Sequence, residues 1–351
     1  MKVLLLKPSS LGDVVHALPV LRLLKLHLPH AQVFWWINAD LVPLLEHDPD
    51  IAGLFPFQRR GWASLPRWHA RFQQMQDMRS HRFDWVIDLQ GLARSAIHAW
   101  LAHGQLTIGL DSGREGAVAL YDHAVPRPAP DAHAVDWYLS AAAHLGIPTN
   151  RPFTWLPQHP HSPTPPHWQP GYRWVTLVPG ARWLNKRWPA ESFAKVVKQL
   201  SRQHSDLRFA IIGSSSDHAL GATIQAANPG TSINLAGATS LPEMIEWLRR
   251  SELCITNDTG PMHLAAALRR PVVALFGPTN PARTGPYQQL HRVLRVPLPC
   301  APCLKASCSR PIHMECLHAL TPETVVAHTH HLLAIPAPNS PTVPDAPVAT
   351  T

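Results

Sequence analysis

The segment Asn257-Asp-Thr-Gly-Pro-Met-His263 contains residue types that suit an anion-binding turn. An apolar run before it predicts a short buried strand over 253–256, and small residues after it predict a helix over 261–268. Such a turn directs free backbone N–H groups and the positive end of the helix dipole at one point, which favours a phosphate. Capping of the helix is the alternative, but it requires neither the glycine nor the histidine. We expect an anion at Asp258, Thr259, Gly260 and His263.

A second strand–loop–helix segment carries the positive charge that an anionic ligand needs. The loop after a predicted strand at 174–177 holds Arg182, Lys186 and Arg187 within six residues. Lysine is a compact point charge and arginine a fork of donors, so this loop can neutralise a diphosphate. Basic loops are also common on protein surfaces, but the position of this loop after a strand end favours a role in binding an anion. Gly213, followed by three serines, suits a ribose or base, or equally a capped helix start.

A third segment of this kind, Pro8-Ser-Ser-Leu-Gly-Asp13, joins the first predicted strand to the first predicted helix. Gly12 permits a close approach to the backbone. Asp13 stands at the helix start, where a lone aspartate is often no more than a cap. As a base, it would face the anion site from the other half of the chain. Transfer between two bound substrates requires that geometry.

Four cysteines follow in the pattern Cys300-x2-Cys303-x4-Cys308-x7-Cys316. The first pair has the spacing of metal ligands, but the second pair does not match a zinc ribbon or finger. A structural zinc or an iron–sulfur cluster is one interpretation, and a set of buried or free thiols is the other. The sequence also lacks a GxGxxG fingerprint and a P-loop, and we interpret Asp48-Pro-Asp50 as a turn instead of a metal–nucleotide site.

Short apolar runs alternate with helical patterns along the chain, which predicts parallel sheets covered by helices on both faces. In the first half we expect strands at 2–7, 32–37, 85–89 and 106–108 and helices at 14–28, 41–47, 68–79 and 93–101. In the second half we expect strands at 174–177, 209–212, 233–235, 253–256 and 272–276 and helices at 191–204, 217–227, 241–251 and 261–268, with a last helix after Thr321. Eight prolines between Ile147 and Tyr172 mark a linker. The predicted units are domains at 1–150 and 173–334, a linker at 151–172 and a disordered tail at 335–351.

The net charge of +8 lies wholly in the second half, because residues 1–150 carry 13 basic and 13 acidic residues. A basic half suits a polyanionic small ligand as well as nucleic acid, but no strand with interleaved aromatic and basic residues supports nucleic acid, which we exclude as a partner. Residues 59–82 hold six arginines against one acid, with aromatic residues between them. They form either a solvated helix face or a contact with an acidic acceptor or an anionic membrane surface. We find no apolar run long enough to span a bilayer and no export signal, so we expect a cytoplasmic protein.

The chain resembles the family 9 glycosyltransferases, the bacterial lipopolysaccharide heptosyltransferases. The resemblance covers nearly all of residues 1–330. It rests on Lys7-Pro-Ser-Ser-Leu-Gly-Asp-Val-Val-His-Ala-Leu-Pro19, Asp88-Leu-Gln-Gly-Leu92, Pro179-Gly-Ala-Arg with Lys186-Arg-Trp-Pro189, Asn257 to His263 and Phe276-Gly-Pro-Thr279. It implies a GT-B fold of two Rossmann-like domains facing a cleft, and inverting transfer of heptose from ADP-heptose without a metal or other cofactor. It also implies that the protein acts at the cytoplasmic face of the inner membrane, as a peripheral protein.

The resemblance further implies a role for individual residues. Asp13 becomes the general base on the acceptor hydroxyl. The donor-binding set is Arg182, Lys186, Gly213, Asp258, Thr259, Gly260 and His263, and the acceptor-binding set is Ser9, Ser10, Gly12, Arg59, Arg60 and Gln90.

The resemblance leaves the acceptor open. Arg59 to Trp62 and Asp111 to Glu115 resemble heptosyltransferase I, for which the acceptor is Kdo–lipid A, whereas the cysteines resemble the second enzyme. The alternatives are therefore a heptosyltransferase II-like acceptor, another nucleotide-sugar, or a sugar-nucleotide epimerase on the same fold.

Overall fold

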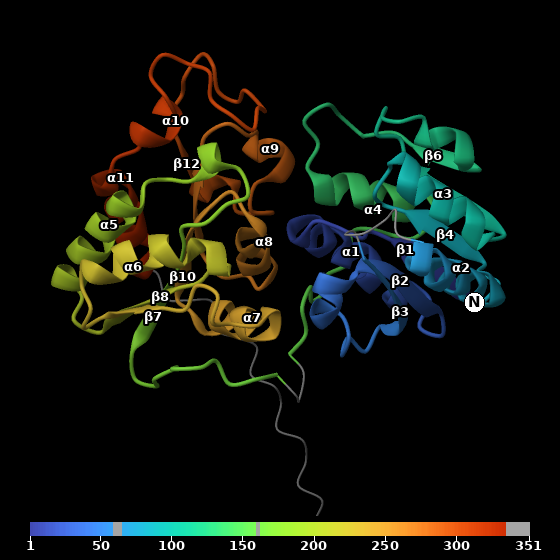
Figure 1. The fold of residues 1–351 in the computed structure, drawn as a ribbon, viewed down its shortest axis with the longest axis horizontal. Helices are drawn as coiled ribbons and strands as arrows, with labels where there is room; N and C mark the ends of the chain where they lie inside the picture. Colours follow the sequence, from blue (N-terminus) through green and yellow to red (C-terminus); the bar gives the residue numbers. More distant parts are fainter. Residues whose placement is uncertain (59–64, 159–161, 335–351) are drawn as a thin grey trace, which may run out of the picture.

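The computed structural model describes residues 1–58, 65–158 and 162–334. These residues form two parallel six-stranded sheets, one from each half of the chain, and the two halves lie side by side (Figure 1). Helices flank each sheet, so the structure confirms the predicted α/β class. The predicted tail at 335–351 lies outside the described residues, and the domain boundaries stay a prediction.

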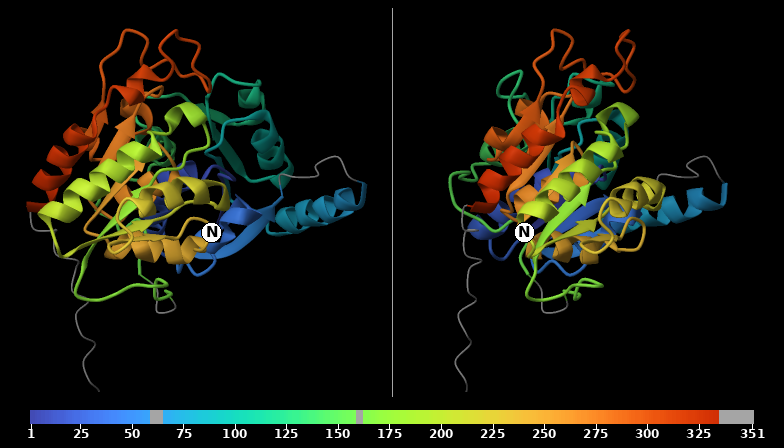
Figure 2. Two further views of the ribbon diagram at one scale, coloured as in Figure 1. Left: turned by 60° about the vertical axis from the view of Figure 1, so that its left-hand side comes forward. Right: turned by 90° about the vertical axis from the view of Figure 1, so that its left-hand side faces the viewer.

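The N-terminal sheet has the strand order β3-β2-β1-β4-β5-β6. Its strands are β1 (Lys2–Leu6), β2 (Gln32–Asn38), β3 (Ile51–Phe57), β4 (Trp85–Asp88), β5 (Leu106–Leu110) and β6 (His123–Val125). Its helices are α1 (Leu11–His27), α2 (Leu65–Ser80), α3 (Ala93–Ala102) and α4 (Ala134–His144), with 3-10 turns η1 (Ala39–Leu44) and η2 (Ala117–Leu120). Helix α2 projects outward from this half (Figure 2).

The C-terminal sheet repeats this pattern in the order β12-β11-β10-β7-β8-β9. Its strands are β7 (Arg173–Val178), β8 (Leu207–Ile211), β9 (Ser232–Asn234), β10 (Leu253–Asn257), β11 (Val272–Phe276) and β12 (Val293–Arg295). The helices are α5 (Ala190–Gln203), α6 (His218–Ala226), α7 (Leu241–Arg250), α8 (Gly260–Ala267), α9 (Pro281–Thr284), α10 (Glu315–His318) and α11 (Pro322–Ala334), with 3-10 turns η3 (Leu184–Lys186), η4 (Ser215–Asp217) and η5 (Leu290–Arg292). Among the described helices, none is long and apolar enough to cross a membrane.

One hydrophobic core runs through both halves. It contains residues of α1 such as Leu18, residues of α8 such as Leu264, and Trp155 from the connecting segment. Helix α1 packs against α4 of its own half and against α8 of the other half (Figure 1). Because α1 has neighbours on several sides, it is buried nearly all round.

Arg22 is a charged residue within this buried helix. Its side chain is only 6% exposed. Its guanidinium forms ion pairs with Asp48 and with Asp50, the latter over 2.6 Å. The Asp48–Asp50 segment is thus the predicted turn, and its carboxylates neutralise a buried arginine.

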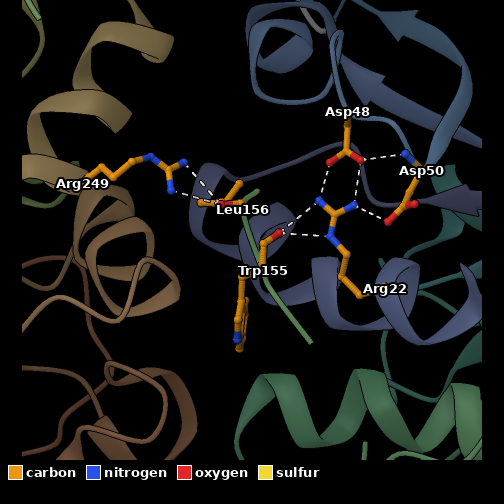
Figure 3. Close-up of polar contacts among 6 residues, drawn as sticks. All are labelled: Arg22, Asp48, Asp50, Trp155, Leu156 and Arg249. Atoms are coloured by element: carbon orange, nitrogen blue, oxygen red, sulfur yellow. Dashed lines mark hydrogen bonds and ion pairs between the residues drawn. The ribbon is translucent and has the colours of Figure 1, made fainter. Parts of the chain in front are cut away.

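The connecting segment is bonded by arginines of both halves. The carbonyl oxygen of Trp155 accepts a hydrogen bond from Arg22 Nη2 over 3.0 Å. The next carbonyl, that of Leu156, accepts one from Arg249 Nη1 of α7 over 3.2 Å (Figure 3). Two consecutive peptide groups are therefore fixed, one by each half of the molecule.

Some elements differ from the expected ones. The helix expected at 41–47 is the shorter 3-10 turn η1, which contains Pro43. Strands β3, β6 and β12 and helix α4 are not among the elements predicted from the sequence. Strand β3 contains Gly53 and Pro56, which disfavour a central strand but are tolerated in this edge strand.

Candidate functional site

A cavity of about 400 Å³ lies between the two halves. The N-terminal half contributes residues at the start of α1, and the C-terminal half contributes the start of α8 and the loop after β7. The lining residues are Ser10, Leu11, Gly12, Asp13, His16, Arg182, Trp183, Lys186, Asp258, Thr259, Gly260, Pro261, His263 and Thr284. Most of the predicted catalytic and donor residues thus meet in one place.

Asp13 completes the capping box of helix α1, whose N-cap is Ser10, and also lines this cavity. Its Oδ2 accepts hydrogen bonds from the backbone N of Ser10 over 2.9 Å and from Ser10 Oγ over 2.8 Å. Burial alone would raise the pKa of Asp13, but the charge of the buried Lys7 and the two Ser10 bonds outweigh burial and lower it. Asp13 is therefore ionised at neutral pH and can accept a proton. The hydrogen bonds with Ser10 also give Asp13 a role in capping helix α1.

The turn between β10 and α8 meets the basic loop that follows β7. Lys186 Nζ donates to Asp258 Oδ2 over 2.6 Å, and Thr279 Oγ1 donates to the same oxygen over 2.6 Å. Of the two residues that could cap α8, Asp258 and Thr259, Thr259 occupies the N-cap position, although its side chain makes no capping hydrogen bond. The ammonium of Lys186 also lies 4.7 Å from the centroid of the Trp183 ring. The ammonium of Lys186 is thus held beside the N-terminus of α8.

Helices α1 and α8 interlock through a glycine on each. A Cβ built on Gly12 would lie 2.3 Å from Cδ2 of His263, and one built on Gly260 would lie 2.9 Å from a methyl carbon of Leu11. Both contacts are too close for any real Cβ. Gly12 therefore admits a side chain of the other half, whereas the sequence suggests only that it admits a ligand.

His263 is hydrogen bonded across the boundary between the halves. Its Nδ1 lies 2.9 Å from Nε2 of His16 on α1. Burial lowers the pKa of His263 to about 4, although Asp258 and Asp13 raise it in part. The sequence gives no indication of this role for His16, because a histidine within an apolar helix has no local signal of a partner on another element.

A second cavity of about 410 Å³ adjoins the first and shares Arg182, Thr259 and Pro261 with it. Gly213 and Ser214 line it, together with residues before and within α7 such as Thr239 and Met244. Asp217 Oδ2 accepts from the backbone N of Ser214 over 2.9 Å, so the capped-turn alternative also holds here.

The predicted acceptor-binding residues do not all line one cavity. Ser10 and Gly12 line the first cavity, whereas Ser9 and Gln90 do not. Gln90 belongs to a turn fixed by Asp88, whose Oδ1 accepts from the backbone N of Gln90 over 2.8 Å and whose Oδ2 accepts from Tyr121 over 2.6 Å. Arg59 and Arg60 lie outside the described residues.

The four cysteines line a separate cavity of about 430 Å³, together with Lys305, Arg310 and Asn185. All four are free thiols. Burial raises the pKa of Cys316, and the other three cysteines raise it further. Within residues 1–58, 65–158 and 162–334, no three histidine, cysteine or acidic side chains are placed to hold a metal ion. The zinc and iron–sulfur interpretations stay predictions.

The chain is similar to known glycosyltransferases over most of its length. The family model described as glycosyltransferase family 9 (heptosyltransferase) matches residues 71–313. Lipopolysaccharide heptosyltransferase 1 of Pseudomonas aeruginosa is 31% identical over 325 residues, which cover 88% of each chain. Lipopolysaccharide heptosyltransferase 2 of Salmonella typhimurium is 28% identical over 361 residues, covering 95% of this chain and 99% of that one.

Solved structures agree with the arrangement of the two sheets. The structure of E. coli ADP-heptose lipopolysaccharide heptosyltransferase II superposes with a TM-score of 0.76 at 25% identity, covering 95% of this chain and 99% of that one. An ADP complex of E. coli heptosyltransferase WaaC gives a TM-score of 0.76 at 24% identity, with 95% and 100% covered, and shows the fold alone. The predicted GT-B fold is thereby confirmed.

Proposed function

The chain belongs to glycosyltransferase family 9, the heptosyltransferases, and on this premise we propose that it transfers heptose from ADP-heptose to the Kdo region of the lipopolysaccharide inner core. One observation carries the proposal. Asp13 of one half and Lys186 with the start of α8 of the other half line the same cavity. A base and an anion site thus face each other across a space of about 400 Å³, as transfer between two bound substrates requires.

Asp13 acts as the general base in this mechanism. Its carboxylate takes the proton of the acceptor hydroxyl while the hydroxyl oxygen forms a bond to the anomeric carbon of heptose. The bond from that carbon to the phosphate oxygen breaks at the same time, and the electron pair leaves with ADP from the opposite face. The configuration at the anomeric carbon is therefore inverted. A positioned base contributes about 10²- to 10⁴-fold to such a rate.

The leaving diphosphate is stabilised by the protein without a metal ion. Lys186 and the free N–H groups at the start of α8 provide positive potential where the charge develops. Arg182 lines both cavities and bridges the diphosphate to the nucleoside, which occupies the second cavity beside Gly213. The Asp258 carboxylate keeps Lys186 in place and is itself held by Thr279.

The acceptor in this proposal is Kdo–lipid A, presented by a membrane with an anionic surface. Residues 59–82, with six arginines, would contact the acidic sugar or the headgroups, which places the enzyme peripherally at the cytoplasmic face of the inner membrane. A heptosyltransferase II-like acceptor is the second candidate, because type 2 enzymes align over nearly the whole chain. We propose no nucleic-acid partner.

One assay tests the proposal and separates its alternatives. The purified protein is incubated with a panel of nucleotide-sugars, with and without Kdo–lipid A or a heptosylated Kdo–lipid A, and the products are weighed by mass spectrometry. We expect ADP release that depends on acceptor, and a product heavier by one heptose. Release of ADP without acceptor would indicate an epimerase-type reaction. Transfer to the heptosylated acceptor alone would indicate the type 2 enzyme.

A further inference from the structure

His16 and His263 share a hydrogen bond that determines which nitrogen of His263 carries the proton. The two rings belong to opposite halves of the molecule, and their centroids lie 4.2 Å apart. The bond joins Nε2 of His16 to Nδ1 of His263 over 2.9 Å. Burial lowers the pKa of both histidines, so both are neutral at physiological pH, and one of them must donate to the other.

The second nitrogen of His16 decides the direction of the bond. His16 Nδ1 is buried and has no hydrogen-bond partner in the described part of the chain. If His263 donated, the proton of His16 would lie on Nδ1 and leave a buried N–H unpaired. If His16 donates from Nε2, its Nδ1 is only an unused acceptor. A buried unpaired N–H is the rarer and costlier arrangement, so the geometry favours His16 as the donor.

The neighbouring His133 cannot change this result. Its ring lies 5.0 Å from that of His16. Both nitrogens of His133 are engaged elsewhere, because Nδ1 accepts from the backbone N of Val135 over 3.1 Å and Nε2 lies 3.0 Å from the carbonyl oxygen of Gly285. His133 therefore offers no acceptor to a proton on His16 Nδ1.

We propose that His16 is a positioning residue that fixes His263 as the tautomer with its proton on Nε2. His263 lines the first cavity, and its Nε2 has no partner among the described residues. Its Nε2–H is therefore available to donate to an oxygen of the donor diphosphate. This inference rests on the proposed function for the identity of that ligand. Since His16 belongs to the N-terminal half, donor binding in the C-terminal half also depends on a residue of the acceptor side.

The tautomer can be measured directly on the full-length protein. Imidazole nitrogen shifts of 15N-labelled enzyme without ligand distinguish the two neutral forms, and His263→Asn identifies the signal. We expect the Nε2–H form for wild type and for His16→Gln, whose amide nitrogen can donate over a similar reach. In His16→Phe, which fills the space without a donor, we expect loss of that preference. A wild-type signal of the Nδ1–H form, or of a protonated ring, overturns the inference even if the Phe variant does not fold.

ADP binding provides a second measurement that does not require transfer. A hydrogen bond to a charged group is worth roughly 10- to 100-fold in affinity, so His16→Phe should weaken ADP binding by about that factor. His16→Gln should stay within about threefold of wild type. If heptose transfer fails while these results hold, the proposed acceptor or sugar is wrong and the tautomer assignment stands. Equal ADP affinity in the Phe variant and wild type would contradict the role of His16.

Discussion

Lys186 and Asp258 lie 72 positions apart in the chain and form an ion pair, with Nζ 2.6 Å from Oδ2. Both side chains are largely buried at the boundary of the first cavity. The ammonium is thus held near the start of α8, which would reduce the rearrangement needed to bind the proposed diphosphate.

The first prediction follows from this pair. Lys186→Ala should raise the donor KM or lower kcat by an amount that corresponds to about 1.5–3 kcal/mol, because the diphosphate loses a charge-assisted partner. Steady-state kinetics with ADP-heptose measure this. Lys198→Ala, which removes an exposed lysine of α5, should change neither constant. Unchanged donor kinetics in Lys186→Ala would remove Lys186 from the site.

Asp13→Asn should lower kcat by about 10²- to 10⁴-fold, because the amide cannot accept the proton of the acceptor hydroxyl. An amide oxygen can still accept from Ser10, so the start of α1 should remain folded, which circular dichroism checks. Near wild-type turnover with both substrates saturating would contradict the assignment of the base.

The pH profile offers an independent check on Asp13. Because its pKa is lowered, the carboxylate stays ionised down to pH values below its ordinary pKa of 3.8. The acid limb of kcat/KM that belongs to this group should therefore lie below pH 4 in wild type. Ser10→Ala removes one hydrogen bond to the carboxylate, which should raise the pKa of Asp13 and move this limb to higher pH. If the acid limb of the pH profile does not move in Ser10→Ala, a group other than Asp13 is responsible for it.

Treatment with EDTA should leave turnover unchanged, since protein cations are proposed to stabilise the leaving group. Metal analysis of the purified wild-type protein and of Cys300→Ser shows whether a metal is bound at the cysteines, independently of turnover. Loss of activity that added Mg²⁺ restores would contradict the metal-independent mechanism. Zinc or iron bound in wild type and lost in Cys300→Ser, with full activity in both, would indicate a structural site only.

Reversal of Arg59 and Arg60 to Glu should weaken use of the acceptor and leave ADP binding unchanged, because the proposed donor site lies on the other half. Each arginine near an anionic surface contributes about 1 kcal/mol, and salt screens this contribution. The rise in acceptor KM should therefore be largest at low ionic strength. A matched reversal of the exposed Lys198 and Arg202 on the C-terminal half is the control. A wild-type acceptor KM at low salt would identify residues 59–82 as a solvated helix face.

Arg22→Met should lower the free energy of unfolding by about 3–5 kcal/mol, because it leaves the carboxylate of Asp48 buried without a counter-ion. Urea denaturation measures this. Arg202→Met, at an exposed position of α5, should have little effect. A small change in Arg22→Met would show that water replaces the guanidinium in the folded protein.

The sequence predicts most of the fold because its strands are apolar and its helices are periodic. Strands such as β10 and β11 are buried on both faces and carry an unmistakable run of apolar residues. Strands β6 and β12 have three residues each and carry no comparable signal. Gly53 and Pro56 interrupt the apolar pattern of β3, so the sequence carries no clear signal for this strand either.

The sequence predicts the turns that form the candidate site, but not the contacts between elements that lie far apart in the chain. Turns at strand ends identify Asp13, Lys186 and the start of α8, since parallel strands end at one edge of a sheet. The partner of each side chain depends on strand order and on how the halves pack, which local patterns do not encode. For that reason the sequence does not reveal that Asp258 pairs with Lys186, and it gives no role to His16.

The reciprocal glycine contacts have a consequence for recombination between family members. Gly12 receives His263 and Gly260 receives Leu11, so each half carries a small residue that matches a large one on the other half. A chimera that joins the N-terminal half of this chain to the C-terminal half of a relative avoids the clash with Leu11 only where that half carries a glycine at the position of Gly260. Exchange of halves between heptosyltransferases therefore requires that the facing turns of α1 and α8 remain matched.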